Sequence, residues 1–549
     1  MSQRQRRRRQ QRRTEAERRH PARRRVTTGA TLAVGATIAA TGSAQAATFT
    51  VTNLDDQGPG SLRQAVIDAN ADATTADDVV FASGLSGTIN VGTDSNYGIY
   101  AVSPMSIKGE GRITLQGGPN VDYVVYTGSG SEPAGVPITL SGLTITGGHA
   151  TGQHFPFKYT DGGGIRNRNA GLTVSDSVIT NNYAEDDGGG IYTYSAEGSV
   201  TVVNSTISDN RAGAYDDGSA YGGGVYSQYS PVTIRSSTVS GNHSGGDAAG
   251  VYMSGGVSTD PSLTVENTTV ANNTAGSGTG DDGGGIWLCC GSGGQSLSLK
   301  SSTITGNHVG GGSGTGGGVV MFAVPASNIN IQSTIIANNT GTVANDIYST
   351  YGGQLDFSLV KELGADSTDT GYSFSTTGTD ITGVDPQLGP LAGNGGPTQT
   401  QLPSASSPVI DKGNSFGLNS DQRGVLRPID FPAIPNAGDG SDIGAVELQP
   451  SSGFKLGKLK RNKKKGTAKQ VVILPVPDAG SVTIKGKGLK SKTRQVTGAA
   501  KVKLPVIAKG KKRKTLSRSG KVKLKTQVIY NATGNAATTL KKKLKLLQR

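Results

Sequence analysis

The feature that most constrains this chain is one phrase that is repeated six times between residues 161 and 339. Every copy opens with a cluster of small residues, mostly glycine, then an aliphatic residue, and it closes on an asparagine. The aliphatic residues recur at steps of 26, 34, 26, 35 and 33 positions, and they are Ile165, Ile191, Val225, Val251, Ile286 and Val319. The closing asparagines are Asn182, Asn210, Asn242, Asn273, Asn307 and Asn339. A repeat of this length predicts a stack of similar structural units.

Each copy of the phrase predicts three short strands and no helix. Apolar residues alternate with Thr or Ser, as Leu172 and Val174 do, and Gly, Asn, Asp and Ser bound the runs. Three strands cannot bury their apolar face alone, so copies must stack around a common core. We therefore predict an all-β chain whose main part is a right-handed parallel β-helix solenoid. The variable step length is expected in loops at one corner, between the asparagine and the next glycine cluster.

The charge is divided sharply along the chain. Residues 1–46 carry 12 arginines and two acids, a net of +10, and residues 451–549 carry 29 basic residues and one acid, a net of +28. The 404 residues between them hold 13 basic and 37 acidic side chains, a net of −24. Together with the repeats, this pattern predicts five segments. They are a secretion signal (1–46), an N-terminal cap with irregular coils (47–135), regular β-helix repeats (136–385), a closing segment of the β-helix (386–450) and a lysine-rich sandwich (451–549).

The N-terminus has the order of an export signal. An arginine-dense stretch ends at Arg25, a mildly apolar run covers residues 26–40, and Ala44-Gln45-Ala46 supplies the small residues of a cleavage site. The apolar run is too short to span a bilayer, so no integral membrane anchor is expected. A nucleic-acid-binding arginine arm is the alternative interpretation, and Arg24-Arg25 leaves a twin-arginine route open.

A short amphipathic helix is expected ahead of the regular repeats. Ser61 is a suitable N-cap, and four following residues share one apolar face. They are Leu62, Ala65, Val66 and Ala69. A solenoid needs its first coil covered, so this helix is predicted to be the cap.

Several stretches resemble known secreted proteins. The opening 51–70 (VTNLDDQGPGSLRQAVIDAN) is similar to the start of a large group of secreted bacterial β-helix proteins. The Gly-Gly-Gly-Ile clusters and closing asparagines resemble the repeats of polymorphic outer-membrane proteins. The stretches Asp385-Pro-Gln-Leu, Asn394-Gly-Gly-Pro-Thr-Gln-Thr, Asp421-Gln-Arg-Gly and Asp442-Ile-Gly-Ala-Val-Glu447 match the group labelled "choice-of-anchor". The resemblance covers about residues 47–450 and implies a pectin-lyase-like β-helix and secretion, but no particular chemistry.

The last hundred residues are expected to form a separate unit. Residues 480–486, 500–505 and 520–526 alternate Lys with Val, Ile or Leu, as half-exposed strands do. They suggest a small basic β-sandwich that resembles an immunoglobulin-like module and has an outer face of lysine. Because the leader sends this unit outside the cell, we expect an anionic envelope polymer as partner rather than nucleic acid. A merely solvated basic face is the alternative, and we expect a monomer.

Enzymatic activity must be weighed, because the β-helix class includes pectate lyases and polygalacturonases. Those hydrolases resemble one another in paired aspartates, a Gly-His-Gly motif and an Arg-x-Lys motif, and only the aspartate pairs occur here. The pairs are Asp186-Asp187, Asp216-Asp217 and Asp281-Asp282. Asp187 and Asp282 are the catalytic candidates for glycoside chemistry. The alternatives are that these six aspartates form turns or bind Ca²⁺ between acidic loops. No other cofactor is expected.

One column of outward residues is rich in aromatic rings. The residue after the aliphatic position is Tyr192, Tyr226, Tyr252 and Trp287 in four consecutive repeats, with Arg166 before them and Val320 after them. Rings with polar rims suit the faces of sugars, so these four residues are the predicted carbohydrate-binding strip. The alternative is a stacked ladder that stiffens the sheet beneath the corner loops.

The histidines and cysteines carry less information. His149, His243 and His308 occupy equivalent positions in their repeats, and at ~4.8 Å per coil they lie about 10 and 14 Å apart. They are therefore too distant to share a metal ion. Cys289 and Cys290 are adjacent, and either a vicinal disulfide or two unreactive thiols fits the sequence.

These observations predict a secreted or cell-surface β-helix protein that binds polysaccharide or the cell envelope, as an adhesin does. A polysaccharide lyase or glycoside hydrolase working from the acidic loops is the second hypothesis. A purely structural surface stalk is the third.

Overall fold

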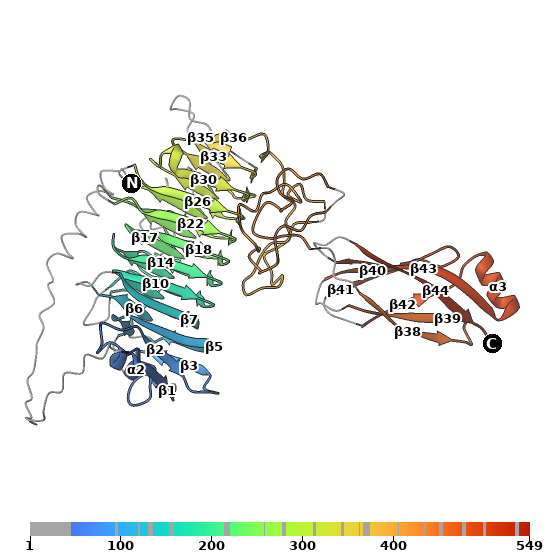
Figure 1. The fold of residues 1–549 in the computed structure, drawn as a ribbon, viewed down its shortest axis with the longest axis horizontal. Helices are drawn as coiled ribbons and strands as arrows, with labels where there is room; N and C mark the ends of the chain where they lie inside the picture. The colour runs from blue at the N-terminus through green and yellow to red at the C-terminus, as the bar shows by residue number, and fades with distance from the viewer. Residues whose placement is uncertain are drawn as a thin grey trace, which may run out of the picture.

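A computed structural model of the chain describes residues 45–93, 97–118, 121–129, 135–152, 159–213, 220–256, 259–276, 282–291, 293–310, 314–341, 345–361, 363–365, 374–404, 406–431, 434–449, 454–474, 479–497, 501–532 and 537–549. The predicted secretion signal lies outside these residues, apart from its last two. The described part contains a parallel β-helix followed by a unit of antiparallel sheets (Figure 1), and this confirms the predicted fold class.

The six strands that follow the glycine clusters stack in a ten-stranded parallel sheet, with two more strands before them and two after them. In order they are β4 (Ile99–Ala101), β6 (Val125–Gly128), β9 (Ile165–Arg168), β13 (Ile191–Tyr194), β17 (Val225–Gln228), β21 (Val251–Ser254), β25 (Ile286–Cys289), β29 (Val319–Met321), β32 (Ile347–Ser349) and β35 (Leu363–Ala365).

The other two predicted strands of each repeat lie together in a 21-stranded parallel sheet. Its members are β1 (Thr48–Val51), β2 (Asp77–Phe81), β3 (Gly87–Val91), β5 (Met105–Gly117), β7 (Val136–Thr146), β10 (Ala170–Ser175), β11 (Val178–Thr180), β14 (Ser199–Val203), β15 (Thr206–Ser208), β18 (Val232–Arg235), β19 (Thr238–Ser240), β22 (Ser262–Glu266), β23 (Thr269–Ala271), β26 (Ser296–Lys300), β27 (Thr303–Thr305), β30 (Ile329–Gln332), β31 (Ile335–Ala337), β33 (Gly353–Asp356), β34 (Leu359–Val360), β36 (Phe374–Thr376) and β37 (Ile381–Thr382).

A third sheet was not predicted. It consists of two-residue strands, all but the first of them directly after a closing asparagine, and these strands are too short to show an alternating pattern. They are β8 (His149–Ala150), β12 (Tyr183–Ala184), β16 (Arg211–Ala212), β20 (His243–Ser244), β24 (Thr274–Ala275) and β28 (His308–Val309). The five coils that contain β12, β16, β20, β24 and β28 therefore have four strands each, and the prediction of three was wrong.

The loops also differ from the prediction. Ten residues separate Leu172 from Asn182, and the same spacing holds in all six repeats. The distance from the aliphatic residue to the next position equivalent to Leu172 varies, however, from seven residues after Ile165 to twelve after Val251. Insertions therefore fall at two corners rather than one, and only the turn between the paired strands of the larger sheet keeps a fixed length.

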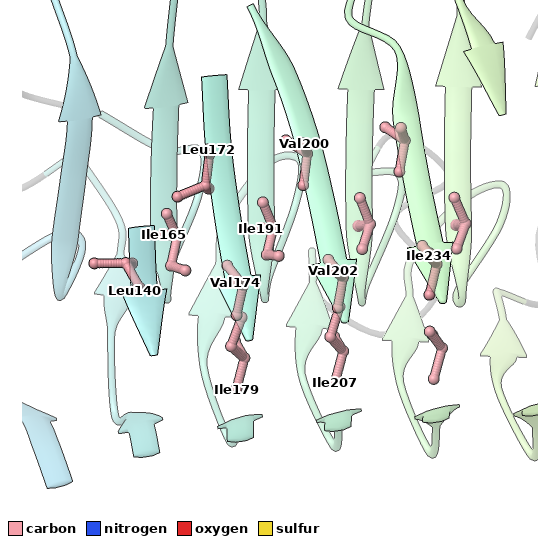
Figure 2. Close-up of a cluster of buried hydrophobic side chains, with 14 of the residues drawn as sticks. Leu140, Ile165, Leu172, Val174, Ile179, Ile191, Val200, Val202, Ile207 and Ile234 are labelled. Atoms are coloured by element: carbon pink, nitrogen blue, oxygen red, sulfur yellow. The ribbon is translucent and has the colours of Figure 1, made fainter. Parts of the chain in front are cut away.

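The core is a set of columns of aliphatic side chains inside the coil. Ile165, Ile191 and Val225 occupy the same register position on successive coils and expose 0% of their surface. Figure 2 shows neighbouring columns, including Val174 and Val202, which point into the same interior. This continuous interior is what a single repeat cannot form alone.

The closing asparagines form a ladder of buried hydrogen bonds. The Nδ2 atom of Asn210 donates to Oδ1 of Asn242 at 3.0 Å, and the backbone N of Asn210 donates to the same oxygen at 3.0 Å. Equivalent Nδ2 bonds of 2.8–3.0 Å join every pair from Asn182 to Asn339. The ladder ends at Asp346, whose Oδ1 accepts from Asn339 at 2.9 Å. The ladder satisfies polar groups that would otherwise be costly to bury.

The first coil is covered by helix α2 (Leu62–Ala69), as predicted. Ser61 caps the helix by accepting from the backbone N of Gln64 at 3.2 Å, and the four predicted apolar residues are buried. Arg63 is also buried, in an ion pair with Asp56 at 2.6 Å. The one 3₁₀ turn among the described residues is η1 (Ala326–Asn328).

The closing segment does not continue the coils. Between β37 and β38 the described residues form turns and isolated bridges, and they pack against the outer face of the larger sheet (Figure 1). Val409, Ile410 and Ile443 form a small core there with Ile335 and Leu359 of the β-helix.

The C-terminal unit has two antiparallel sheets around its own core, as predicted. We call residues 451–549 the basic sandwich. One sheet contains β38 (Lys455–Asn462), β39 (Thr467–Ile473) and β42 (Lys501–Val506). The other contains β40 (Ala479–Lys485), β41 (Lys492–Thr497), β43 (Lys521–Ala532) and β44 (Thr538–Leu547). A short helix, α3 (Lys511–Ser519), precedes β43.

Candidate functional site

The predicted aromatic column exists and its rings stack. The ring centroids of Tyr192 and Tyr226 are 5.2 Å apart with an interplanar angle of 0°, and those of Tyr226 and Tyr252 are 5.0 Å apart at 7°. Trp287 continues the stack at 4.7 Å from Tyr252. Parallel strands in register place these side chains one coil apart, and the rings fill the coil spacing.

The prediction that this strip is accessible to sugars is wrong. Tyr192, Tyr226 and Tyr252 each expose 4% of their surface, and Trp287 exposes 3%. The rings lie outside the aliphatic core, but they form a second buried cluster against partly buried side chains of the corner loops. These covering side chains include Tyr221 and Phe322, and Tyr194 at the end of β13 packs against the same cluster. The structure therefore agrees with the alternative interpretation, in which the four rings form a stacked ladder beneath the corner loops.

The column is longer than the sequence pattern indicated. The register adds Tyr100 and Tyr126 before Arg166, and Tyr348 after Val320. Each new tyrosine also follows an aliphatic residue, so the signal was present, but no triple-glycine cluster marks these coils.

Arg166 closes the gap between the two sets of rings. Its guanidinium carbon lies 4.0 Å from the ring centroid of Tyr159 and 4.8 Å from that of Tyr192, and Nη1 is 3.0 Å from Asp161. Such contacts stabilise a cation that is only 3% exposed.

The aspartates before the glycine clusters hold the corners together. Oδ1 of Asp187 accepts from the backbone N of Tyr221 at 3.0 Å, and Oδ1 of Asp282 accepts from the backbone N of Thr315 at 2.7 Å. Asp247, which is not part of an Asp-Asp pair, accepts in the same way from the backbone N of Asp282 at 2.9 Å. These bonds agree with the interpretation of the aspartates as turn-forming residues.

Asp187 and Asp282 do not form a catalytic pair. They expose 1% and 8% of their surface, and three coil steps separate them along the stack. At ~4.8 Å per step the separation is about 14 Å, beyond the 5–9.5 Å that paired glycosidase carboxylates need. The other predicted acids Asp216, Asp217 and Asp281 lie outside the described residues.

One group of carboxylates is compatible with the calcium hypothesis. Asp161, Asp186 and Asp187 each bring a carboxylate oxygen within 4.8 Å of the others. Oxygen atoms are the ligands that Ca²⁺ prefers. Arg166 already supplies a positive charge to Asp161, however, so the cluster is partly neutralised without a cation.

A groove that the sequence did not predict lies between the β-helix and the closing segment. It encloses about 510 Å³, and one side is formed by strand and turn residues of four successive coils. These residues are Val178, Thr206, Ser208, Asp209, Ser240, Gly241 and Asn272. The other side is formed by Leu391, Gly393, Gly396, Pro397, Thr398 and Gln399. Asp209 is the only titratable side chain among the residues that line it.

The basic sandwich has an unusual distribution of charge. All 29 of its Lys and Arg side chains are exposed, and its described residues include no acid. Lys523 lies directly opposite Lys545 across β43 and β44, and Lys525 lies opposite Lys543. Like charges in such pairs destabilise a sheet.

The structure also shows how the three histidines are arranged and how the two cysteines are bonded. His149, His243 and His308 belong to one column, as predicted, and Tyr183, Arg211 and Thr274 fill the positions between them. Burial lowers the pKa of His243, and Arg211 lowers it further. Cys289 and Cys290 form a vicinal disulfide.

Comparison with known proteins supports the class of fold. Residues 134–323 match the family model described as "Right handed beta helix region". The match and the parallel sheets together define a β-helix protein. No curated protein matches the chain. In the part of the chain that the structure describes, no helix has the length and hydrophobicity needed to cross a membrane.

Proposed function

We propose that this protein is secreted, remains associated with the cell surface, and binds an anionic polymer of the cell envelope through its basic sandwich. The observation that carries the proposal is the exposure of all 29 basic side chains in a unit whose described residues contain no acid. Binding of a polyanion to such a surface releases condensed counterions, which favours association at low salt.

The facing lysines strengthen this proposal. The pairs Lys523–Lys545 and Lys525–Lys543 place positive charges on the same outer face of one sheet, where the Cβ atoms of facing residues are typically about 4.5–5.5 Å apart. Helix α3 adds Lys511, Lys512, Arg513 and Lys514 in its first turn, where positive charge opposes the helix dipole. Both arrangements cost stability in the free protein, and a bound polyanion relieves both costs.

The β-helix has the opposite charge and its own core. Residues 47–450 carry a net charge of −24 and are not suited to hold a polyanion. In this proposal the β-helix extends the chain from the envelope and the basic sandwich attaches it, as in an adhesin.

The experiment measures retention of the full-length protein on cells and on two purified polymers, polyphosphate and polygalacturonate. We expect the protein to elute as the salt concentration rises from about 50 to 200 mM. A chain lacking residues 451–549 should remain in the medium, because the two units have separate cores. The two polymers distinguish phosphate from carboxylate as the recognised group.

A charge-matched pair of variants provides the control. Replacing Lys523, Lys525, Lys543 and Lys545 with Gln should weaken retention. Replacing Lys108, Lys300 and Lys361 of the β-helix and Lys412 of the closing segment with Gln changes the net charge equally and should have little effect. Retention that ignores salt would overturn the proposal, and binding to DNA in preference to both polymers would replace it with a nucleic-acid function.

A further inference from the structure

The short strands of the larger sheet present an outward polar face that the closing segment covers only in part. Val178, Thr206 and Thr238 occupy the same register position on successive coils. Thr238 and Thr269 expose 0% of their surface because the closing segment lies over them. Val178 is 37% exposed and Thr206 is half-buried, so the cover stops at β19.

On the covered coils, hydroxyl groups of this face donate hydrogen bonds to the closing segment. Oγ1 of Thr238 donates to the backbone O of Gln399 at 2.6 Å, and Oγ1 of Thr269 donates to Oε1 of Gln422 at 2.6 Å. Thr206 is one coil before Thr238 and carries the same hydroxyl in the same position. The face therefore continues into the groove, where the chain itself does not cover it.

We propose that this groove is a binding site for a neutral polysaccharide chain that lies along the axis of the solenoid. Its floor repeats hydroxyl groups at the coil spacing of ~4.8 Å, through Thr206 and Ser208 on one coil and Ser240 on the next. Its wall adds the apolar side chains of Leu391 and Pro397. A sugar chain requires both hydroxyl groups and an apolar wall, because it presents hydroxyls at the rim and C–H groups on the ring faces.

The negative charge in and around the groove favours a neutral ligand over an anionic one. Asp209 is the only titratable residue in its lining, and the surrounding unit carries a net charge of −24. An anionic polymer would be repelled there, since like charges brought together in an interface are costly. This inference is independent of the proposed function: the basic sandwich takes the polyanion and the groove takes the neutral glycan.

The test is calorimetric titration of the full-length protein with cellohexaose, laminarihexaose, xylohexaose and maltohexaose at high salt, where the charges of the basic sandwich are screened. We expect at least one of these probes to bind. Ser208→Tyr places a ring inside the groove and should weaken that binding at least tenfold. Thr146→Tyr introduces the same ring at the equivalent position two coils earlier, outside the groove, and should leave binding unchanged.

A second variant keeps the test decisive if Ser208→Tyr fails to fold. Leu391→Ala removes the apolar wall at a half-buried position and should also weaken binding several-fold, with circular dichroism unchanged. Binding of none of the four probes, or equal binding by the Ser208→Tyr and Thr146→Tyr variants, overturns the inference. Because the probes are uncharged, failure here leaves the salt-dependent retention of the proposed function standing.

Discussion

The indole of Trp287 lies on the ring of Tyr252 with their centroids 4.7 Å apart and their planes inclined by 19°. Both side chains belong to a cluster that is separate from the aliphatic core and almost fully covered. The contact lies between β21 and β25, so it joins two coils in addition to their backbone hydrogen bonds. Stacking of this kind adds to the stability gained from burial alone.

Truncating this ring should destabilise the β-helix. Trp287→Ala is expected to lower the free energy of unfolding by about 3–5 kcal/mol, measured by urea denaturation. Trp287→Phe should cost less, because it keeps a ring and removes a buried indole N–H that has no hydrogen-bond partner among the described residues. Tyr351, which is 39% exposed, supplies the control, and Tyr351→Ala should have a much smaller effect. Unchanged stability of Trp287→Ala, with loss of glycan binding, would restore the binding-strip hypothesis.

The asparagine ladder should be as sensitive as the core. In Asn242→Leu, the backbone N and Nδ2 of Asn210 lose their acceptor, and the backbone O of Ile207 loses its donor. Each buried group left unpaired costs about 1–3 kcal/mol, so we expect a loss of several kcal/mol in urea denaturation. Asn90 is exposed on β3, and Asn90→Ala should change stability by less than about 0.5 kcal/mol. Comparable losses in the two variants would show that the ladder adds nothing.

Much of this fold is predictable because its stabilising pattern is periodic. The eleven residues from Leu172 to Asn182 include most of one strand, all of a second strand and a ladder position, and each later repeat keeps that spacing. Ser61 and the apolar face after it predicted the cap because a helix N-terminus depends on local residues. The two-residue strands had no such signal, since two residues cannot alternate.

The candidate sites were less predictable, because they depend on what covers a residue rather than on its own type. The position of Trp287 in an outward column was correct, but its burial comes from corner residues that follow no repeat. The groove was missed entirely. Its wall at Leu391 is more than 180 residues from Thr206 in sequence, and no pattern links the two.

The closing segment should be more stable in mild acid. Burial raises the pKa of Glu447 to about 7, although Arg427 opposes the shift from 3.1 Å away. The folded state therefore keeps a proton that the unfolded state releases above pH ~4.5. Stability from this group is fully present below that pH and is lost as the pH rises through about 7.

Glu447→Gln isolates this effect. Urea unfolding of wild type should show lower stability at neutral pH than in mild acid, with a slope of at most about 1.4 kcal/mol per pH unit from Glu447. The variant should lose that part of the slope. An equal pH dependence in the two proteins would refute the assignment to Glu447. Burial also raises the pKa of Asp442 beside it, so some dependence of the same sign should remain.

An acidic substitution at one of the facing lysines should stabilise the basic sandwich and weaken its binding to a polyanion. Lys523→Glu replaces a repulsive pair with an opposite-charge pair to Lys545 and should stabilise the basic sandwich by about 0.2–1 kcal/mol. The same change should lower the salt concentration that elutes the protein from polygalacturonate. Lys490 is exposed and lies outside the strands, so Lys490→Glu should weaken retention without the gain in stability. Thermal denaturation and elution from the polymer check the two expectations separately.

The exported protein should begin at Ala47. Ala44 and Ala46 supply the small residues that a signal peptidase requires. Mass spectrometry of protein recovered from the medium or the cell surface determines the N-terminus directly, and recovery of exported protein that still carries Met1 would refute cleavage. In Ala46→Arg the cleavage should be blocked or displaced, whereas Gln45→Ala should leave it in place.

The asparagine ladder also affects how the length of this molecule can change in evolution. Every asparagine between Asn182 and Asn339 accepts from the coil before it and donates to the coil after it, and only Asp346 ends the series. Each interior coil therefore makes the same asparagine hydrogen bonds to its two neighbours as any other interior coil does. Duplication or deletion of a single repeat changes the molecule's reach by one increment of ~4.8 Å and leaves both ends as they were. Selection can thus adjust the span of the protein independently of what its two ends do.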